Sequence, residues 1–193
     1  MASRRAAVAI FLGLLLGAGC GSATNEADDG GSTSVGEPAC APFEGGTQSR
    51  TGGEPTGTML LTDVTAAAEK CADRIAFDFR PDRSETPGYR VEYRPAEDAQ
   101  TEDGSGNHVD VEGSAFLVVR MEPAATADLS GEDVKMTYTG PRRFAATGAK
   151  HATEVVKIGD FEGVVTWTIG LDERRPFRLV TSGSPPRLVV EIG

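Results

Sequence analysis

Alternating apolar and polar residues mark several short stretches of this chain after residue 57. The clearest example is 74–79, where Ile75, Phe77 and Phe79 fall on one side and the residues between them fall on the other. A period of two is typical of a β-strand that buries one face. The same alternation, or a short apolar run, predicts further strands at 60–64, 89–94, 115–121, 153–158, 164–170, 177–181 and 187–192.

Glycine and proline separate the predicted strands, for example at Pro87-Gly88 and Pro185-Pro186. Residues 66–70 favour a helix by composition but are too few to form one alone, and no period of 3.6 requires a helix elsewhere. Many short strands joined by such turns are typical of all-β domains. We therefore predict an all-β fold for 57–193, as a β-sandwich of short, mostly antiparallel strands; a partly open barrel is the alternative.

The first nineteen residues have the three parts of a secretory signal peptide. A basic start at Ser3-Arg4-Arg5 is followed by an apolar run over 6–16 and by the small residues Gly17-Ala18-Gly19. Export signals show these parts in this order. The apolar run is only about half of the roughly 20 residues that a helix needs to cross a bilayer. We predict that residues 1–19 are removed on export.

Cys20 directly follows these small residues, and the arrangement resembles a bacterial lipobox, in which the cysteine carries acyl chains. Gly17 stands where that motif has Leu, Val or Ile. Two or more acyl chains anchor a protein durably. We therefore predict an extracytoplasmic protein held at the outer face of the bacterial cell membrane by lipidated Cys20. Cleavage after Ala23 and release of the chain is the alternative.

Residues 20–56 are rich in glycine and contain almost no large apolar side chains. Such a segment buries too little apolar surface to offset the entropy of ordering it, which predicts a flexible, lipid-anchored linker. Cys40 and Cys71 are expected to form a disulfide in an oxidising compartment. Two thiolates without nearby histidines do not complete a tetrahedral zinc site.

The charge and the histidine count narrow the classes of function. The 193 residues carry a net charge of −10, which argues against nucleic acid as a partner because that requires clustered lysine and arginine. The sequence has two histidines, and no phosphate-binding loop, nucleophile elbow or zinc-protease motif occurs. We predict no metal, no cofactor and no catalytic residue.

Seven segments follow one another in a set order: Cys71–Phe79, Pro87–Tyr93, Gly113–Val119, Gly159–Trp167, Ile169–Asp172, Pro176–Arg178 and Pro185–Ile192. Together, over 57–193, they resemble the AMIN-like domain of actinobacterial envelope lipoproteins, a relative of the AMIN domain. The resemblance implies a β-sandwich that works outside the cytoplasm. AMIN domains accompany cell-wall amidases and secretins and target them to peptidoglycan or the division site. In such amidases a separate zinc domain is catalytic, and this chain has no room for one.

Charged and aromatic side chains on the predicted strands and turns are candidates for ligand binding. Carboxylates on a turn can accept hydrogen bonds from sugar hydroxyls, aromatic rings can stack on sugars, and arginines can pair with the carboxylates of a peptide. Solvated turns, core packing and a charged outer sheet face are the alternative interpretations. The candidates are Arg90, Tyr93, Asp160, Glu162, Trp167 and Arg178.

These observations favour a non-catalytic envelope lipoprotein that binds a cell-wall component, such as peptidoglycan glycan, or an envelope protein. Two alternatives remain. The first is an envelope hydrolase that uses Asp160 and Glu162, although residues two apart on one turn do not establish the geometry of a glycosidase pair. The second is a carrier of a small apolar ligand between the sheets.

Overall fold

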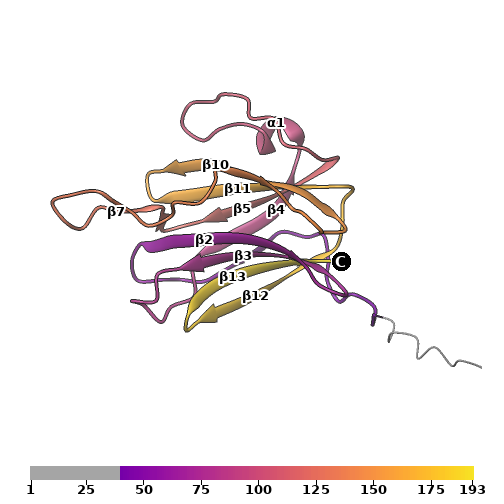
Figure 1. Cartoon of the computed structure of the whole chain (residues 1–193), viewed down its shortest axis with the longest axis horizontal. Helices are drawn as coiled ribbons and strands as arrows, with labels where there is room; N and C mark the ends of the chain where they lie inside the picture. Colours follow the sequence, from indigo (N-terminus) through magenta and orange to yellow (C-terminus); the bar gives the residue numbers. More distant parts are fainter. Residues whose placement is uncertain (1–39) are drawn as a thin grey trace, which may run out of the picture. The chain divides into compact units, whose positions relative to one another are not determined.

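The computed structural model describes residues 40–193, and these residues are almost entirely β-structure (Figure 1). A six-stranded sheet has the order β1 (Arg50–Gly52), β4 (Tyr89–Arg94), β5 (Ala115–Met121), β11 (Val164–Leu171), β10 (Ala152–Phe161), β9 (Arg143–Ala145). A five-stranded sheet has the order β12 (Phe177–Gly183), β13 (Pro186–Ile192), β3 (Asp73–Phe79), β2 (Met59–Ala68), β6 (Ala124–Ala125). Strand pairing is antiparallel in both sheets except between β2 and β6.

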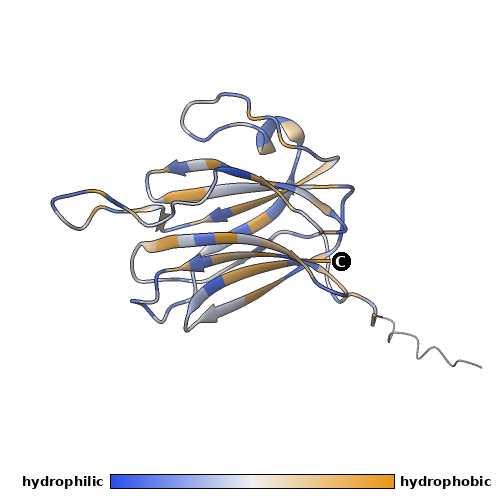
Figure 2. Cartoon of the chain, in the orientation of Figure 1, coloured by the Kyte–Doolittle hydropathy of each residue, from blue (hydrophilic) through white to orange (hydrophobic). Residues whose placement is uncertain are grey.

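The two sheets pack face to face, which confirms the predicted β-sandwich. Figure 2 shows hydrophobic and hydrophilic residues alternating along the strands. The apolar members form one buried core between the sheets. Phe77 of β3 and Trp167 of β11 meet edge to face across this core, with ring centroids 6.1 Å apart. The period of two in the sequence therefore identifies the buried faces correctly, as at Ile75 and Phe79.

Some local predictions need correction. The strand predicted at 60–64 is longer in the structure, where it forms β2. Its later residues Ala66 and Ala68 still pair with Ile75 and Asp73 of β3. The helical propensity of 66–70 is overridden, since strand pairing supplies backbone hydrogen bonds that one isolated helical turn cannot match. The polar stretch after β5 holds short strands, among them β7 (Ala127–Asp128) and β8 (Lys135–Met136), which form a two-stranded hairpin.

A short third layer covers part of the outer face of the six-stranded sheet. It consists of α1 (Ala96–Ala99) and the following loop to residue 111. A second apolar cluster lies beneath it, and the Thr168 hydroxyl donates a hydrogen bond of 2.7 Å to the Ala99 carbonyl. None of the helices in residues 40–193 has the length and apolar composition to cross a membrane.

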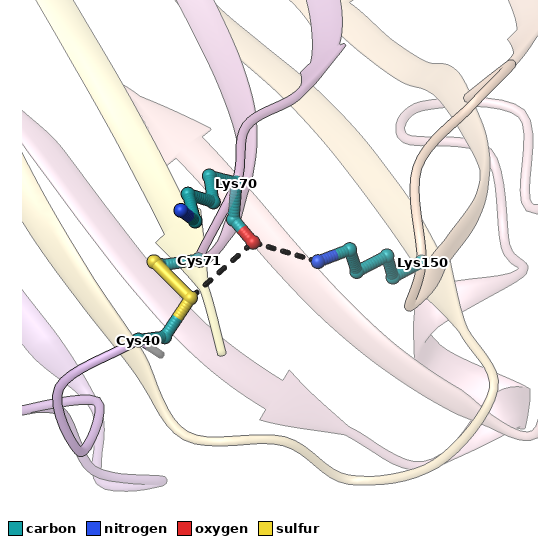
Figure 3. The surroundings of a disulfide bond; sticks show 4 residues. All are labelled: Cys40, Lys70, Cys71 and Lys150. Carbon is teal, nitrogen blue, oxygen red and sulfur yellow. Dashed lines mark hydrogen bonds between the residues drawn. A yellow bond between two sulfur atoms is a disulfide. The ribbon is translucent and has the colours of Figure 1, made fainter. Parts of the chain in front are cut away.

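Residues 40–56, which the sequence assigns to a flexible linker, pair with the β-sandwich. Cys40 and Cys71 form the predicted disulfide, with Cα atoms 5.5 Å apart (Figure 3). Gly46 exchanges two backbone hydrogen bonds with Phe177, and β1 pairs with β4. Residues 40–56 are therefore part of the folded unit rather than of the predicted linker. The predicted signal peptide, Cys20 and the rest of 1–39 lie outside the described residues.

The disulfide closes a loop with a sequence separation of 31. Closing such a loop removes conformational entropy from the unfolded chain, worth roughly 3–4 kcal/mol. The Lys70 carbonyl oxygen lies 3.4 Å from Cys40 Sγ and accepts a 2.7 Å hydrogen bond from Lys150 Nζ (Figure 3). The disulfide thus lies where the N-terminal segment, the end of β2 and the loop before β10 meet.

Asp73 is a buried carboxylate in the same region. It is fully buried at the start of β3. Its two oxygens accept hydrogen bonds from three consecutive backbone N–H groups, those of Lys150 (2.8 Å), His151 (2.7 Å) and Ala152 (2.9 Å). A buried polar group is tolerated when it is hydrogen-bonded in this way. Asp73 therefore fixes the entry of the chain into β10 against the opposite sheet.

The sandwich has two distinct ends. The disulfide end holds Cys71 and the C-terminal Gly193, and in Figure 1 the C-terminus lies on this side. The hairpin end holds the β10–β11 turn, the β12–β13 turn and the projecting β7–β8 hairpin. Strand β10 runs from the disulfide end toward the hairpin end, so Asp160 and Phe161 lie at the hairpin end.

Candidate binding site

The structure does not bring the six predicted ligand residues together. Trp167 is fully buried, and its indole contacts Phe77, Tyr138 and Phe144 at centroid distances of 5.6–6.4 Å. A ring without exposed surface cannot serve as a platform for a sugar. The inclusion of Trp167 among the ligand residues is therefore wrong, and core packing is its role.

Tyr93 is hydrogen-bonded to the loop between β11 and β12. Its hydroxyl donates a 2.7 Å hydrogen bond to the Arg175 carbonyl and accepts a 2.9 Å bond from the Arg175 backbone N–H. The Arg174 guanidinium lies 4.6 Å from the ring centroid. Burial raises the pKa of the Tyr93 hydroxyl. The hydroxyl thus uses its donor and an acceptor position within the protein. The role of Tyr93 is therefore to hold this loop in place and not to bind a ligand at an exposed site.

Arg178 lies on the opposite sheet, at the disulfide end. Its guanidinium forms an ion pair with Glu191 on β13 and lies 5.1 Å from the ring centroid of Phe43. Glu191 also pairs with Arg74 at 3.4 Å. Arg178 thus holds the N-terminal segment against the five-stranded sheet, and it does not share a site with Arg90 or Asp160.

Asp160 lies in a cleft of about 640 Å³ at the hairpin end, here called the Phe161 cleft. Residues far apart in sequence line it: Asp103 from the loop after α1, Arg142 from the segment before β9, and Lys157, Asp160 and Phe161 from β10. Phe161 is 55% exposed although it is a large apolar residue. The cleft therefore combines an accessible aromatic ring with acids and bases.

Hydrogen bonds hold the charged groups of the Phe161 cleft in place. Asp160 accepts hydrogen bonds from the Thr126 hydroxyl and, at 3.2 Å, from Lys157 Nζ. Arg142 pairs with Glu102 at 2.5 Å. Hydrogen bonds from Ser105 and from Arg142 hold the pKa of the Glu102 carboxyl below its ordinary value. The acids of this cleft are thus positioned as acceptors of further hydrogen bonds.

Gly159 is required for this arrangement. A Cβ atom built at Gly159 would lie 2.0 Å from Asp103 Oδ2, so only glycine lets the loop carboxylate approach β10 this closely. Glu162 does not line the cleft. It forms a two-residue turn with Gly163, in which Glu162 has a φ of 50° and Gly163 a φ of 78°. Two left-handed residues define a type I′ hairpin turn. The two predicted turn acids, Asp160 and Glu162, therefore do not line this cleft together.

Arg90 lies in a second cleft, of about 480 Å³, on the outer face of the same sheet at the hairpin end. Arg120 lines it as well, and we call it the arginine cleft. Glu54 and Glu122 contribute carboxylates to its wall. Of the six predicted residues, only Arg90 and Asp160 line the two clefts at this end of the sheet.

The fold and these clefts define an all-β sandwich domain with charged, open recesses at one end. The family model of the AMIN-like domain matches residues 59–193. The chain belongs to the AMIN-like domain family. The match begins at the first residue of β2 and leaves β1 outside it. No curated protein and no solved structure matches the chain.

Proposed function

We propose that this protein is a non-catalytic envelope lipoprotein, and that its AMIN-like domain binds the glycan of the cell wall through the Phe161 cleft. Membership of the AMIN-like family supports a role in the envelope or with peptidoglycan. The single observation that carries the choice of site is the exposed Phe161 ring beside positioned carboxylates.

The chemistry of the cleft suits a sugar with N-acetyl and hydroxyl groups. An exposed ring offers an apolar face on which the C–H groups of a sugar stack, as aromatic side chains do at other amphipathic interfaces. Carboxylates of Asp103 and Asp160 accept hydrogen bonds from hydroxyl and amide groups, and Arg142 and Lys157 donate them. A small number of placed polar groups around an apolar surface is the usual composition of a ligand site.

Retention by purified cell-wall sacculi tests the glycan proposal. Residues 40–193 hold the folded domain and serve as the test protein. Phe161→Ala is expected to weaken the affinity for sacculi about five-fold and so to lower the retained fraction, since aromatic stacking is worth about 1 kcal/mol. Val180→Ala is the matched control, because Val180 is also exposed, at 44%, but lies on the other sheet. Equal retention of both variants and the unchanged protein would exclude this cleft.

The same incubation addresses the hydrolase alternative. A binding domain leaves the sacculi intact, so the soluble fraction should contain no released glycan fragments. Release that disappears in both Asp103→Asn and Asp160→Asn would instead establish catalysis by these two acids, which line the cleft.

The proposed lipid anchor is tested in cells. Cys20→Ala removes the thiol that would receive the acyl chains, and the protein is expected to move from the membrane fraction to the medium. Loss of two or more acyl chains removes durable anchoring, since each buried CH₂ contributes about 0.8 kcal/mol. A wild-type protein that is already in the medium and begins near Thr24 would contradict the anchor.

A further inference from the structure

The arginine cleft contains an arrangement that sheet energetics disfavour. Arg90 on β4 and Arg120 on β5 are direct partners in the antiparallel register, and both lie on the outer face. Their side chains are 54% and 37% exposed. Like charges directly opposite each other destabilise a strand pair. Each arginine also has a carboxylate neighbour on or next to its own strand, since Arg90 lies 3.8 Å from Glu92 and Arg120 lies 2.7 Å from Glu122.

Glycines bring the walls of the arginine cleft together. A Cβ atom at Gly88 would lie 2.1 Å from the Glu122 carbonyl oxygen, and one at Gly53 would lie 1.9 Å from that of Pro87. Gly53 also has a φ of 72°, which side-chain-bearing residues rarely adopt. The segment after β1, the entry to β4 and the end of β5 can therefore approach one another only because these positions lack side chains.

Thr166 is the next residue along the same row of the sheet. It pairs with Arg120 from β11 and alternates with the inward-facing Val165 and Trp167, so it lies on the outer face with the two arginines. Thr166 is 3% exposed, and its hydroxyl oxygen has no hydrogen-bond partner within residues 40–193. Thr166 is not among the residues that line the arginine cleft, so the row of outward-facing polar residues continues beyond the cleft as a buried position.

The acids of the cleft restrict the charge of a ligand. Glu122 approaches Arg120 at 2.7 Å, and Glu54 lines the opposite wall. A phosphate dianion would meet both carboxylates and be repelled. A ligand that carries one carboxylate and one ammonium group matches the two arginines and the two glutamates together, because arginine forks onto carboxylate and glutamate accepts from ammonium.

We propose that the arginine cleft binds the free carboxylate end of a short zwitterionic peptide, with the carboxylate between Arg90 and Arg120 and the ammonium group toward Glu54 and Glu122. This proposal adds a second ligand group to the proposed function. It rests on the proposed function in one respect only, namely that the peptide belongs to a cell-wall polymer. The Phe161 cleft lies along the same sheet row, since Thr166 also pairs with Gly159. Three interstrand spacings, about 14–15 Å, separate the strand of Arg90 from that of Gly159.

Calorimetric titration with three dipeptides tests the proposal. The probes are alanyl-alanine, its N-acetyl form and its C-terminal amide. Alanyl-alanine is expected to bind to the unchanged protein, the amide to bind at least ten-fold more weakly, and the N-acetyl form to lie between them. Inorganic phosphate is the fourth probe. Phosphate binding as tight as that of alanyl-alanine, or equal binding of the dipeptide and its amide, overturns the proposal.

Variants of the protein supply the second half of the test. Arg90→Gln and Arg120→Gln should each weaken alanyl-alanine binding at least ten-fold, whereas Arg187→Gln, an exposed arginine on the other sheet, should leave it unchanged. Arg120→Lys keeps the charge but loses the fork, so it should give an intermediate affinity. Unchanged circular dichroism checks folding. Absence of dipeptide binding refutes this site while leaving sacculus retention through Phe161 intact, which separates the two proposals.

Discussion

Replacement of Trp167 by alanine is expected to lower the free energy of unfolding by roughly 3–5 kcal/mol, the range for large aromatic truncations in a packed core. The indole is fully buried between the sheets and contacts the rings of Phe77, Tyr138 and Phe144. The backbone strands around it are fixed by pairing on both sides of β11. Because the surrounding sheets cannot collapse into the space, the variant keeps a cavity.

Urea unfolding followed by circular dichroism measures this effect, since the variant loses the single tryptophan that would report by fluorescence. Trp167→Phe is the informative control. The indole Nε1 has no hydrogen-bond partner in residues 40–193, so phenylalanine removes an unsatisfied donor while it keeps most of the ring. Its cost should be far smaller. Equal midpoints for the alanine variant and the unchanged protein would show that the core tolerates the cavity.

Asp73→Ala is expected to destabilise the domain by roughly 3–5 kcal/mol, because three backbone N–H groups lose their acceptor in a buried position. The donors are the consecutive amides of Lys150, His151 and Ala152. The change therefore acts at the junction between β3 and the entry to β10, on different sheets.

Hydrogen exchange locates this effect. The amides of residues 150–152 should exchange faster in Asp73→Ala, ahead of the core strands. Asp73→Asn keeps one acceptor oxygen and should be intermediate. Asp172→Asn is the matched control, since Asp172 is also hydrogen-bonded but 39% exposed, and exposed pairs contribute about 0–1 kcal/mol. If both aspartate positions gave the same small loss, the buried contact would not have the importance assigned to it.

Strand positions and the buried face could be predicted because both are local properties. Alternation along 74–79 requires knowledge of only six residues, and the side chains that it assigns to the interior, such as Phe77, are buried. Pairing between segments that are distant in sequence is not a local property and cannot be predicted in this way. Residues 50–52 show no apolar pattern, and their place in β1 depends on backbone hydrogen bonds to β4, which no composition reveals. For this reason the contacts of residues 40–56 with the domain could not be predicted from the sequence.

The candidate site was predictable only in part. Period-two alternation assigns Trp167 to the same side as Val165 and Ile169, and that signal favoured the core over a sugar platform. Asp103 and Arg142 reach the Phe161 cleft from loops, whose course no pattern in the sequence specifies. Phe161 itself carried one usable signal, since it directly precedes the two-residue turn, where the sheet ends and an apolar side chain is no longer covered.

Because the two ends of the sandwich are separate, the domain can be immobilised through its termini without blocking the clefts. Cys40 enters at the disulfide end, and Gly193 lies at that end too, whereas both clefts open at the hairpin end. A sensor chip coupled to either terminus of the domain would thus leave both recesses facing the flowing sample. For the same reason, two such domains fused in tandem through their termini would each keep an unobstructed recognition surface.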